Sequence, residues 1–125
     1  MIGQVNVMSE SAEQKALIEW WALECRYFGV PECLLMAIPN GGKRDRVTGA
    51  RLKAEGVRAG VPDLFLAVAR GPWHGLWIEM KTEKGKVSRE QKKMIPLLCE
   101  QGYHVIVCHG WVEAEAAIEC YLRAA

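Results

Sequence analysis

The sequence has no run of apolar residues long enough to cross a membrane as a helix. Such a span needs about eighteen or more consecutive apolar residues, and polar or charged residues interrupt every stretch before that length is reached. No apolar leader of the kind that a secretory signal requires precedes the first polar residues. We therefore expect a cytoplasmic protein that has no membrane partner.

The sequence also lacks the cysteine pattern of a disulfide framework or a zinc site. Its five cysteines are odd in number, and no two of them form a C-x-x-C pair. Most of them have apolar neighbours, and reduced thiols are typical of the cytoplasm. We expect reduced thiols in the core at Cys25, Cys33, Cys99, Cys108 and Cys120.

Several enzyme signatures are missing as well. The chain has neither a GxGxxG fingerprint nor Walker spacing. The Gly-Gly pair within residues 40–44, flanked by Lys43 and Arg44, is either a phosphate contact or a plain solvated turn. The three histidines lack HNH spacing and have no suitably placed serine or cysteine beside them, which leaves a hydrolase triad unsupported.

The length and composition are those of one ordinary globular domain that spans residues 1–125. The chain has 125 residues and a net charge of +1, with half of its residues apolar and a quarter charged. Residues 43–58 are locally basic, with six Lys or Arg against two acids. A charge run is usually a solvated face, but this one is also a candidate nucleic-acid contact. The candidate DNA-binding residues are Lys43, Arg44, Arg51, Lys53 and Arg58.

Hydrophobic periodicity and turn residues divide the chain into eight elements. Ser9 is expected to cap the first helix, Thr48 to cap the second, and Gly56 to end the second. Ser88 and Gln91 form a capping box at the start of the third helix. We expect helices over residues 10–27, 48–56, 89–101 and 112–122, and strands over residues 33–39, 63–69, 75–81 and 103–108. This order predicts an α/β fold with a four-stranded mixed sheet flanked by helices.

The most informative stretch is the expected hairpin of residues 61–86. From Gly75 to Lys81 the residues alternate, so that Leu76, Ile78 and Met80 share one face of a strand, and Trp77, Glu79 and Lys81 share the other. Glu79 and Lys81 then project from the same side, about 7 Å apart. If the hairpin folds about the middle of residues 70–75, Asp63 falls opposite or nearly opposite Lys81.

Two acids and a lysine at one point are the arrangement of a metal-dependent phosphodiesterase. Glu79 and Lys81 are also explained as a surface ion pair on an exposed strand. Three classes therefore stay open: an active nuclease, a catalytically silent nucleic-acid-binding module, and a structural or regulatory interaction protein.

The ordered set of short motifs resembles a VRR-NUC domain, a branch of the PD-(D/E)XK nuclease superfamily. These motifs are Pro39-Asn40-Gly41-Gly42, the glycines Gly56 and Gly60 before Pro62-Asp63, then Glu79-Met80-Lys81 and Ser88-Arg89-Glu90-Gln91. The resemblance covers residues 9–109. It implies a restriction-endonuclease-like PD-(D/E)XK core. Small stand-alone members of this family are common in bacteriophages, so the resemblance also implies the cytoplasm of a bacterial host.

The resemblance implies a role for each matching residue. Asp63 and Glu79 would bind the metal together with the carbonyl of Met80. Lys81 would be the catalytic lysine, and Gln91 the motif glutamine near the site. The family's first-helix glutamate best matches Glu10, with Glu13 and Glu19 as rivals. The namesake Val-Arg-Arg is only partly present, as Val57-Arg58-Ala59.

The activity implied is hydrolysis of DNA phosphodiester bonds with Mg²⁺ or Mn²⁺, ions that prefer hard oxygen ligands. Structure-selective cleavage is also implied, with four-way junctions or flaps as the candidate substrates. One small domain has one active centre, whereas cutting both strands needs two. We therefore expect a homodimer, built on apolar surfaces near Trp73 or Trp111.

Overall fold

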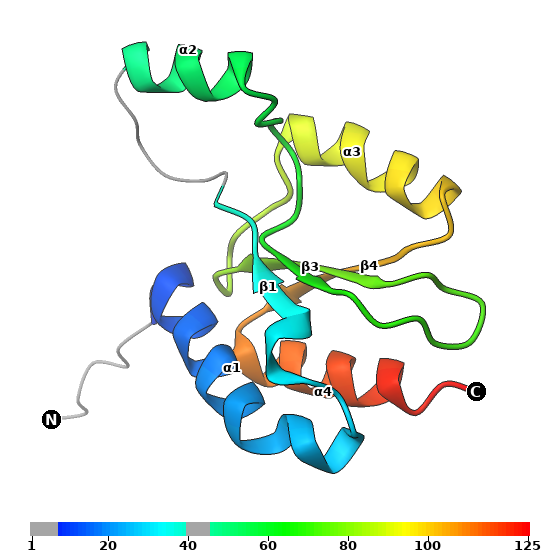
Figure 1. Cartoon of the computed structure of the whole chain (residues 1–125). Coiled ribbons are helices and arrows are strands. Elements are labelled where there is room, and N and C mark those ends of the chain that lie inside the picture. Colours follow the sequence, from blue (N-terminus) through cyan, green and yellow to red (C-terminus); the bar gives the residue numbers. More distant parts are fainter. Residues whose placement is uncertain (1–7, 40–45) are drawn as a thin grey trace, which may run out of the picture.

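The computed structural model describes residues 8–39 and 46–125, and the expected contacts of Lys43 and Arg44 lie outside these ranges. The element order is that expected from the sequence, with two added 3₁₀ turns (Figure 1). The helices are α1 (Glu10–Glu24), α2 (Arg46–Ala54), α3 (Arg89–Glu100) and α4 (Trp111–Leu122), the 3₁₀ turns are Cys25–Phe28 and Glu32–Leu34, and the strands are β1 (Leu35–Ala37), β2 (Leu64–Leu66), β3 (Leu76–Lys81) and β4 (His104–His109).

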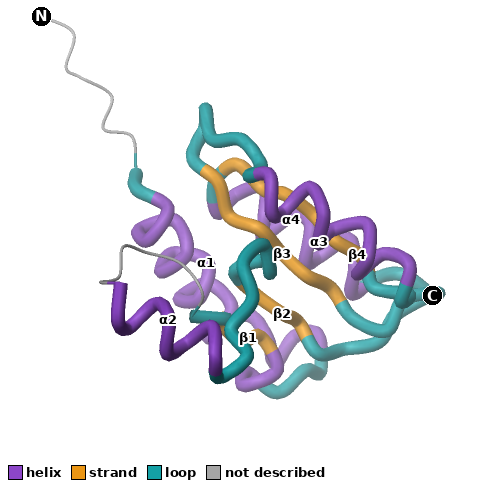
Figure 2. The backbone as a smooth tube through the Cα atoms, turned by 90° about the horizontal axis from the view of Figure 1, so that it is seen from above, coloured by secondary structure: helices purple, strands orange, loops and turns teal. Residues whose placement is uncertain are grey.

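The four strands form one mixed sheet in the order β1-β2-β3-β4. The pairs β1–β2 and β2–β3 are antiparallel, and the pair β3–β4 is parallel. Figure 2 shows the strands side by side in this order. The α/β fold with a four-stranded mixed sheet flanked by helices is therefore confirmed.

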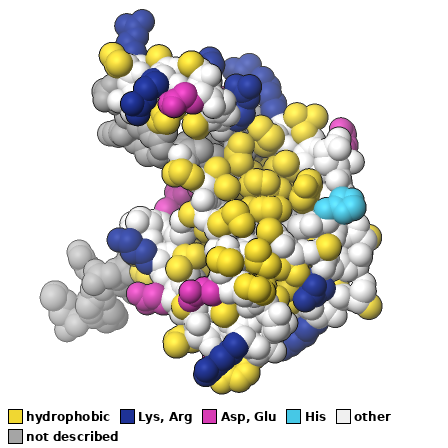
Figure 3. Space-filling model, viewed as in Figure 1, with side chains coloured by type: hydrophobic (Ala, Val, Ile, Leu, Met, Phe, Trp, Pro, Cys, Tyr) yellow, Lys and Arg dark blue, Asp and Glu magenta, His cyan; other side chains and the backbone are white. Residues whose placement is uncertain are grey.

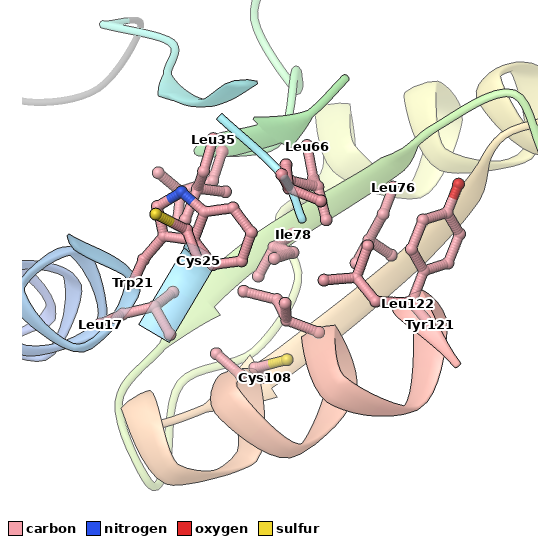
Figure 4. Close-up of a cluster of buried hydrophobic side chains, with 14 of the residues drawn as sticks. Leu17, Trp21, Cys25, Leu35, Leu66, Leu76, Ile78, Cys108, Tyr121 and Leu122 are labelled. Carbon is pink, nitrogen blue, oxygen red and sulfur yellow. The ribbon is translucent and has the colours of Figure 1, made fainter. Parts of the chain in front are cut away.

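The main core lies on the face of the sheet that α1 and α4 cover (Figures 1 and 4). Alternation along β3 sends three fully buried apolar side chains, Leu76, Ile78 and Met80, to this face. Leu17 and Trp21 of α1 meet them there. The core also includes Leu64, Leu66, Cys108, Ala114, Ile118, Tyr121 and Leu122.

The other face of the sheet carries α3 and an aromatic group. The rings of Phe65 and Trp77 lie 4.4 Å apart, and Tyr103 packs edge-on to both. This group covers the far end of the face that also bears Glu79 and Lys81, as the position of Trp77 in the sequence suggests. By contrast, α2 buries none of its residues and stands apart from the sheet in Figures 1 and 2.

Several helix ends follow the expected local chemistry. Ser9 caps α1 by accepting the N–H of Ala12, and Ser88 and Gln91 form the full capping box of α3. Gly56, at φ +103°, ends α2 with the paired backbone bonds of a Schellman motif. Thr48 is not a cap, because the described part of α2 already begins at Arg46.

The strands are shorter than the sequence suggests. The strand expected over residues 63–69 stops at Leu66, because the chain turns back just beyond it, where Val68 donates its N–H to Leu66 O. In the strand expected over residues 33–39, Cys33 and Leu34 belong to a 3₁₀ turn instead. The helix expected over residues 10–27 changes to a 3₁₀ turn after Glu24.

The cysteines are all free thiols, as expected, but only two of them lie in the core. Cys25 and Cys108 are buried, whereas Cys33, Cys99 and Cys120 are exposed, so the expectation of core positions is wrong for these three. Trp73 and Trp111 are partly buried against the core of their own chain. Among the described helices, none is both long and apolar enough to cross a bilayer.

Candidate active site

Three carboxylates from distant parts of the chain meet at the open end of the β2–β3 hairpin. One oxygen each from Glu10, Asp63 and Glu79 lies within 4.8 Å of the others. The three come from the first turn of α1, the residue before β2, and the middle of β3. Such a group of hard oxygen donors suits a divalent cation.

The sheet register fixes the two acids of the hairpin. Leu64 pairs with Ile78, so the register continues Asp63 to Glu79 rather than to Lys81. One oxygen of Asp63 accepts the Met80 N–H at 2.8 Å, which aims its carboxylate along β3. Met80 therefore holds Asp63 through its backbone nitrogen, and the metal-binding role expected of its carbonyl stays a prediction.

The three candidate glutamates of α1 lie in different surroundings. Glu10 reaches the acidic cluster. Glu13 accepts the Trp111 N–H at 2.6 Å and so holds the start of α4. Glu19 lies two turns further along α1, in a neighbouring groove. The geometry thus gives the place near Asp63 and Glu79 to Glu10 and a structural contact to Glu13.

Lys81 completes the group on the same face of β3. Its Nζ lies 3.0 Å from Glu79 Oε2, and its side chain is 12% exposed. A mostly buried ammonium beside a buried carboxylate is held in one place, unlike a surface pair. The surface-pair interpretation therefore does not fit Glu79, whose side chain is only 2% exposed.

Gln91 lies beside the acids in the first turn of α3 and is buried. Its side-chain oxygen accepts the Ser88 N–H at 2.9 Å and its backbone N–H donates to Ser88 Oγ. The capping box therefore fixes the side chain at the edge of the site. Its proximity to Glu79 is compatible with the capping role, as expected.

Burial makes Glu79 an unusual carboxylate. Removal from water raises its pKa above the ordinary value of 4.5, and the negative charge of Asp63 raises it further. Lys81 and the neighbouring amide of Gln91 favour the ionised form and lower this pKa, but burial dominates. Without a further cation, keeping Glu79 ionised beside Asp63 therefore costs free energy.

The same carboxylate has an unused binding atom. Glu79 Oε1 is buried and has no hydrogen-bond partner among the described residues. A buried polar atom without a partner costs free energy, and a cation at this point would remove that cost. The donors present therefore fit a resident divalent metal ion.

The acids line a cavity of about 280 Å³. Ser88 and Glu90 of the α3 start and the backbone around Gly60 form its other walls. Gly60 has φ +88°, and a Cβ there would lie 2.5 Å from the carbonyl oxygen of Glu90. Only glycine allows this approach. Glu90 was not among the expected site residues, because nothing in the local sequence distinguishes it from a helix-start acid.

Of the expected DNA-binding residues, the three that the structure describes lie on α2 or just after it, outside the acidic cluster. Arg51 and Lys53 are exposed in the last turn of α2, and Arg58 is exposed just after it. Arg51 forms a loose, exposed pair with Glu55, with its Nε 3.6 Å from Oε1. Figure 3 shows several basic side chains on the α2 lobe, at the top of this view.

The fold and the acidic cluster define a class of protein, the small α/β domains that carry a candidate metal site. The model of the VRR-NUC domain family matches residues 8–111, and the chain therefore belongs to this family, whose members are generally nucleases. A solved structure described as a "VRR_NUC domain protein" matches with a TM-score of 0.81 and 28% sequence identity, covering 94% of this chain and 91% of that one. No curated protein matches the sequence.

Proposed function

We propose that this protein is a metal-dependent DNA endonuclease that hydrolyses phosphodiester bonds. The observation that carries the proposal is the unpartnered buried oxygen of Glu79, placed within a cluster of three carboxylates beside Lys81. A solvated surface or an interaction face would not keep a buried carboxylate oxygen without a partner. The cost is explained if the acid binds a cation needed for the reaction.

Glu10, Asp63 and Glu79 are the residues that would hold the ion, with the Met80 carbonyl as a further ligand. Mg²⁺ or Mn²⁺ bound there would supply positive charge beside the phosphate and a water of lowered pKa. The proposed reaction is attack of a water oxygen on phosphorus, with cleavage of the opposite P–O bond. Lys81 orients that water and stabilises the charge that builds on the phosphate oxygens.

The basic residues are proposed to bind the DNA backbone. Arg51, Lys53 and Arg58 line one exposed stretch at the end of α2 and beyond it, and we propose DNA contacts for Lys43 and Arg44 from the sequence alone. Contacts of this kind are electrostatic and independent of sequence. They would hold the duplex arms of a substrate while the acidic cluster cuts.

We further propose that the enzyme acts in the cytoplasm as a homodimer on four-way junction or flap DNA. One acidic cluster of this kind lies among the described residues. Symmetric cleavage of two strands therefore needs a second copy.

A panel of labelled linear duplex, flap and four-way-junction DNAs tests this proposal. Each is incubated with Mg²⁺, Mn²⁺ or EDTA, and the products are separated on denaturing gels. We expect cleavage with either metal, none with EDTA, and fastest cleavage of a branched substrate. Binding of these DNAs without cleavage in any metal would contradict the nuclease and leave a silent nucleic-acid-binding module. Sedimentation of the protein alone tests the dimer independently.

A further inference from the structure

A second, larger hollow opens directly onto the acidic cluster. A groove of about 650 Å³ runs between α1 and the end of β1. Asp63 lines both this groove and the 280 Å³ cavity of the acids, so the two spaces adjoin at that residue. The volume lies within the usual range for small-ligand sites. We call this space the α1 groove.

One side of α1 contributes residues both to the acidic cluster and to the α1 groove. Glu10, Gln14 and Ile18 are spaced by four residues and lie on one side of the helix, about 12 Å from first to last. Glu10 belongs to the cluster, while Gln14 and Ile18 line the groove. Ile18 is a large apolar residue that is 37% exposed there.

The opposite wall of the groove is tied to the site. Ile38 lines it and donates its backbone N–H to the carbonyl oxygen of Asp63 at 2.8 Å. This bond fixes the apolar wall relative to the acid that is expected to bind metal. A group held between Ile18 and Ile38 would therefore lie at a set distance from the reacting centre.

The charges of the α1 groove select the kind of group that fits it. Asp63 stands at the inner end and Glu19 further out, so a phosphate inside the groove would meet acids on two sides. Lys15, the single cation among the described residues that line the groove, is exposed. Two isoleucines and one amide suit a flat, uncharged group with a hydrogen-bonding edge, and Lys15 suits a phosphate outside.

We propose that the α1 groove binds the base and sugar of one unpaired nucleotide next to the cleaved phosphate. Ile18 and Ile38 contact the base, Gln14 binds its polar edge, and Lys15 pairs with the following phosphate. The inference rests on the proposed nuclease function and deepens it. A paired base cannot enter such a groove without leaving its stack, and that costs free energy. Selectivity for flaps or junctions then arises at the site itself.

Cleavage of matched flap substrates tests the groove. One substrate is intact, and the other has an abasic sugar at the nucleotide beside the cut. We expect Ile18→Ala to slow cleavage of the intact flap about tenfold, the usual order for one lost base contact, and to leave the abasic flap unchanged. Leu23→Ala is the matched control, because Leu23 is an exposed α1 residue outside the groove. Equal slowing of both substrates, or of neither, would overturn the inference.

A binding measurement tests the same point without catalysis. Flap DNA carries 2-aminopurine, whose emission rises when it leaves the base stack, at one position at a time near the branch. We expect Lys81→Ala protein to raise the emission at a single position, and Lys81→Ala with Ile18→Ala to lose that rise. No rise at any position would overturn the groove proposal. If wild type cuts no DNA, the nuclease proposal fails alone, and the emission rise still supports the groove.

Discussion

The two faces of β3 carry side chains of opposite character, although one strand of six residues supplies both. Toward α1 and α4 the strand presents Leu76, Ile78 and Met80, all essentially inaccessible to water. Toward the start of α3 it presents Glu79 and Lys81, an acid and a base held almost as deeply. Burial stabilises the first face and strains the second, because apolar groups gain from leaving water and charges lose.

The difference shows how a small domain carries a costly site. The apolar face is continuous with the core that it forms with α1 and α4. The polar face is bounded by the capping box of α3 and by the close contact of Gly60 with Glu90. It contains one buried oxygen, Glu79 Oε1, that has no hydrogen-bond partner among the described residues. The stability of one face permits the strain of the other. Changes to the first should therefore act on folding, and changes to the second mainly on chemistry.

The largest effect should come from the apolar face. Ile78 is fully buried, and Ile78→Ala should lower the free energy of unfolding by about 4 kcal/mol, from lost transfer energy and a residual cavity. Urea denaturation measures this. At temperatures where the variant is folded, its cleavage rate should stay near that of wild type. A large loss of cleavage rate in the folded variant would contradict the claim that the apolar face acts on folding and the polar face on chemistry.

Gly60 tests how tightly the polar face is built. Gly60→Ala should cost about 3 kcal/mol of stability, because the new Cβ meets the backbone of Glu90 as well as a disfavoured φ. Gly56 is the control, with φ +103° and no atom within 4 Å of such a Cβ, so Gly56→Ala should cost only about 1 kcal/mol. Equal costs in urea denaturation would show that the close approach does not constrain the site.

The three candidate glutamates of α1 (Glu10, Glu13 and Glu19) separate catalysis from structure. Glu10→Gln should slow cleavage about a hundredfold, close to 2.7 kcal/mol in the barrier, with little change in melting temperature. Glu13→Gln should mainly lower the melting temperature, because it weakens the bond to Trp111 N–H. Glu19→Gln should change neither. A rate loss confined to Glu13→Gln or Glu19→Gln would move the metal-binding role to that residue.

Glu79→Gln should give a small change in stability, of the opposite sign to those of Ile78→Ala and Gly60→Ala. The folded protein raises the pKa of Glu79 above 4.5, so it holds this proton longer than the unfolded chain. The free energy of unfolding therefore falls as the pH rises from 4.5 to the raised pKa of Glu79. In EDTA, Glu79→Gln should be more stable than wild type at neutral pH by about 1 kcal/mol, a common gain when a strained functional site is relaxed, with no gain below pH 4.5.

Divalent metal should reverse that order. Added Mg²⁺ should raise the melting temperature of wild type, because an ion that binds only the folded state stabilises it. The Glu79→Gln variant should show little shift. An unchanged melting temperature of wild type across a wide Mg²⁺ titration would contradict a cation site at Glu79.

Local patterns predicted what depends on neighbours in the chain. The alternation of residues predicted that Glu79 and Lys81 share one face, and Ser9 and Ser88 correctly indicated where their helices start. The length of β2 could not be predicted in this way, because it depends on where β1 begins: Leu34, which accepts the N–H of Ala67, belongs to a 3₁₀ turn. The same is true of the cysteines, since apolar neighbours in sequence do not tell which side of a helix a residue occupies.

The candidate site shows the same limit. The hairpin brought Asp63 near Glu79 by sequence pattern alone, although the register differs from the expected pairing with Lys81. Glu10 is separated from Asp63 by more than fifty residues, and only the family resemblance singled it out from Glu13 and Glu19. Contacts between distant elements, such as Glu13 with Trp111, decide those roles. The α1 groove was not expected at all, because its two walls come from α1 and the end of β1.

The most direct test of the account is cleavage of labelled flap and four-way-junction DNA by wild type and Lys81→Ala in Mg²⁺, each compared with EDTA. The account predicts metal-dependent cleavage by wild type and a rate at least about a hundredfold lower for Lys81→Ala, with DNA binding retained. Equal cleavage by the two proteins would contradict the central claim that the acids and Lys81 form the nuclease centre.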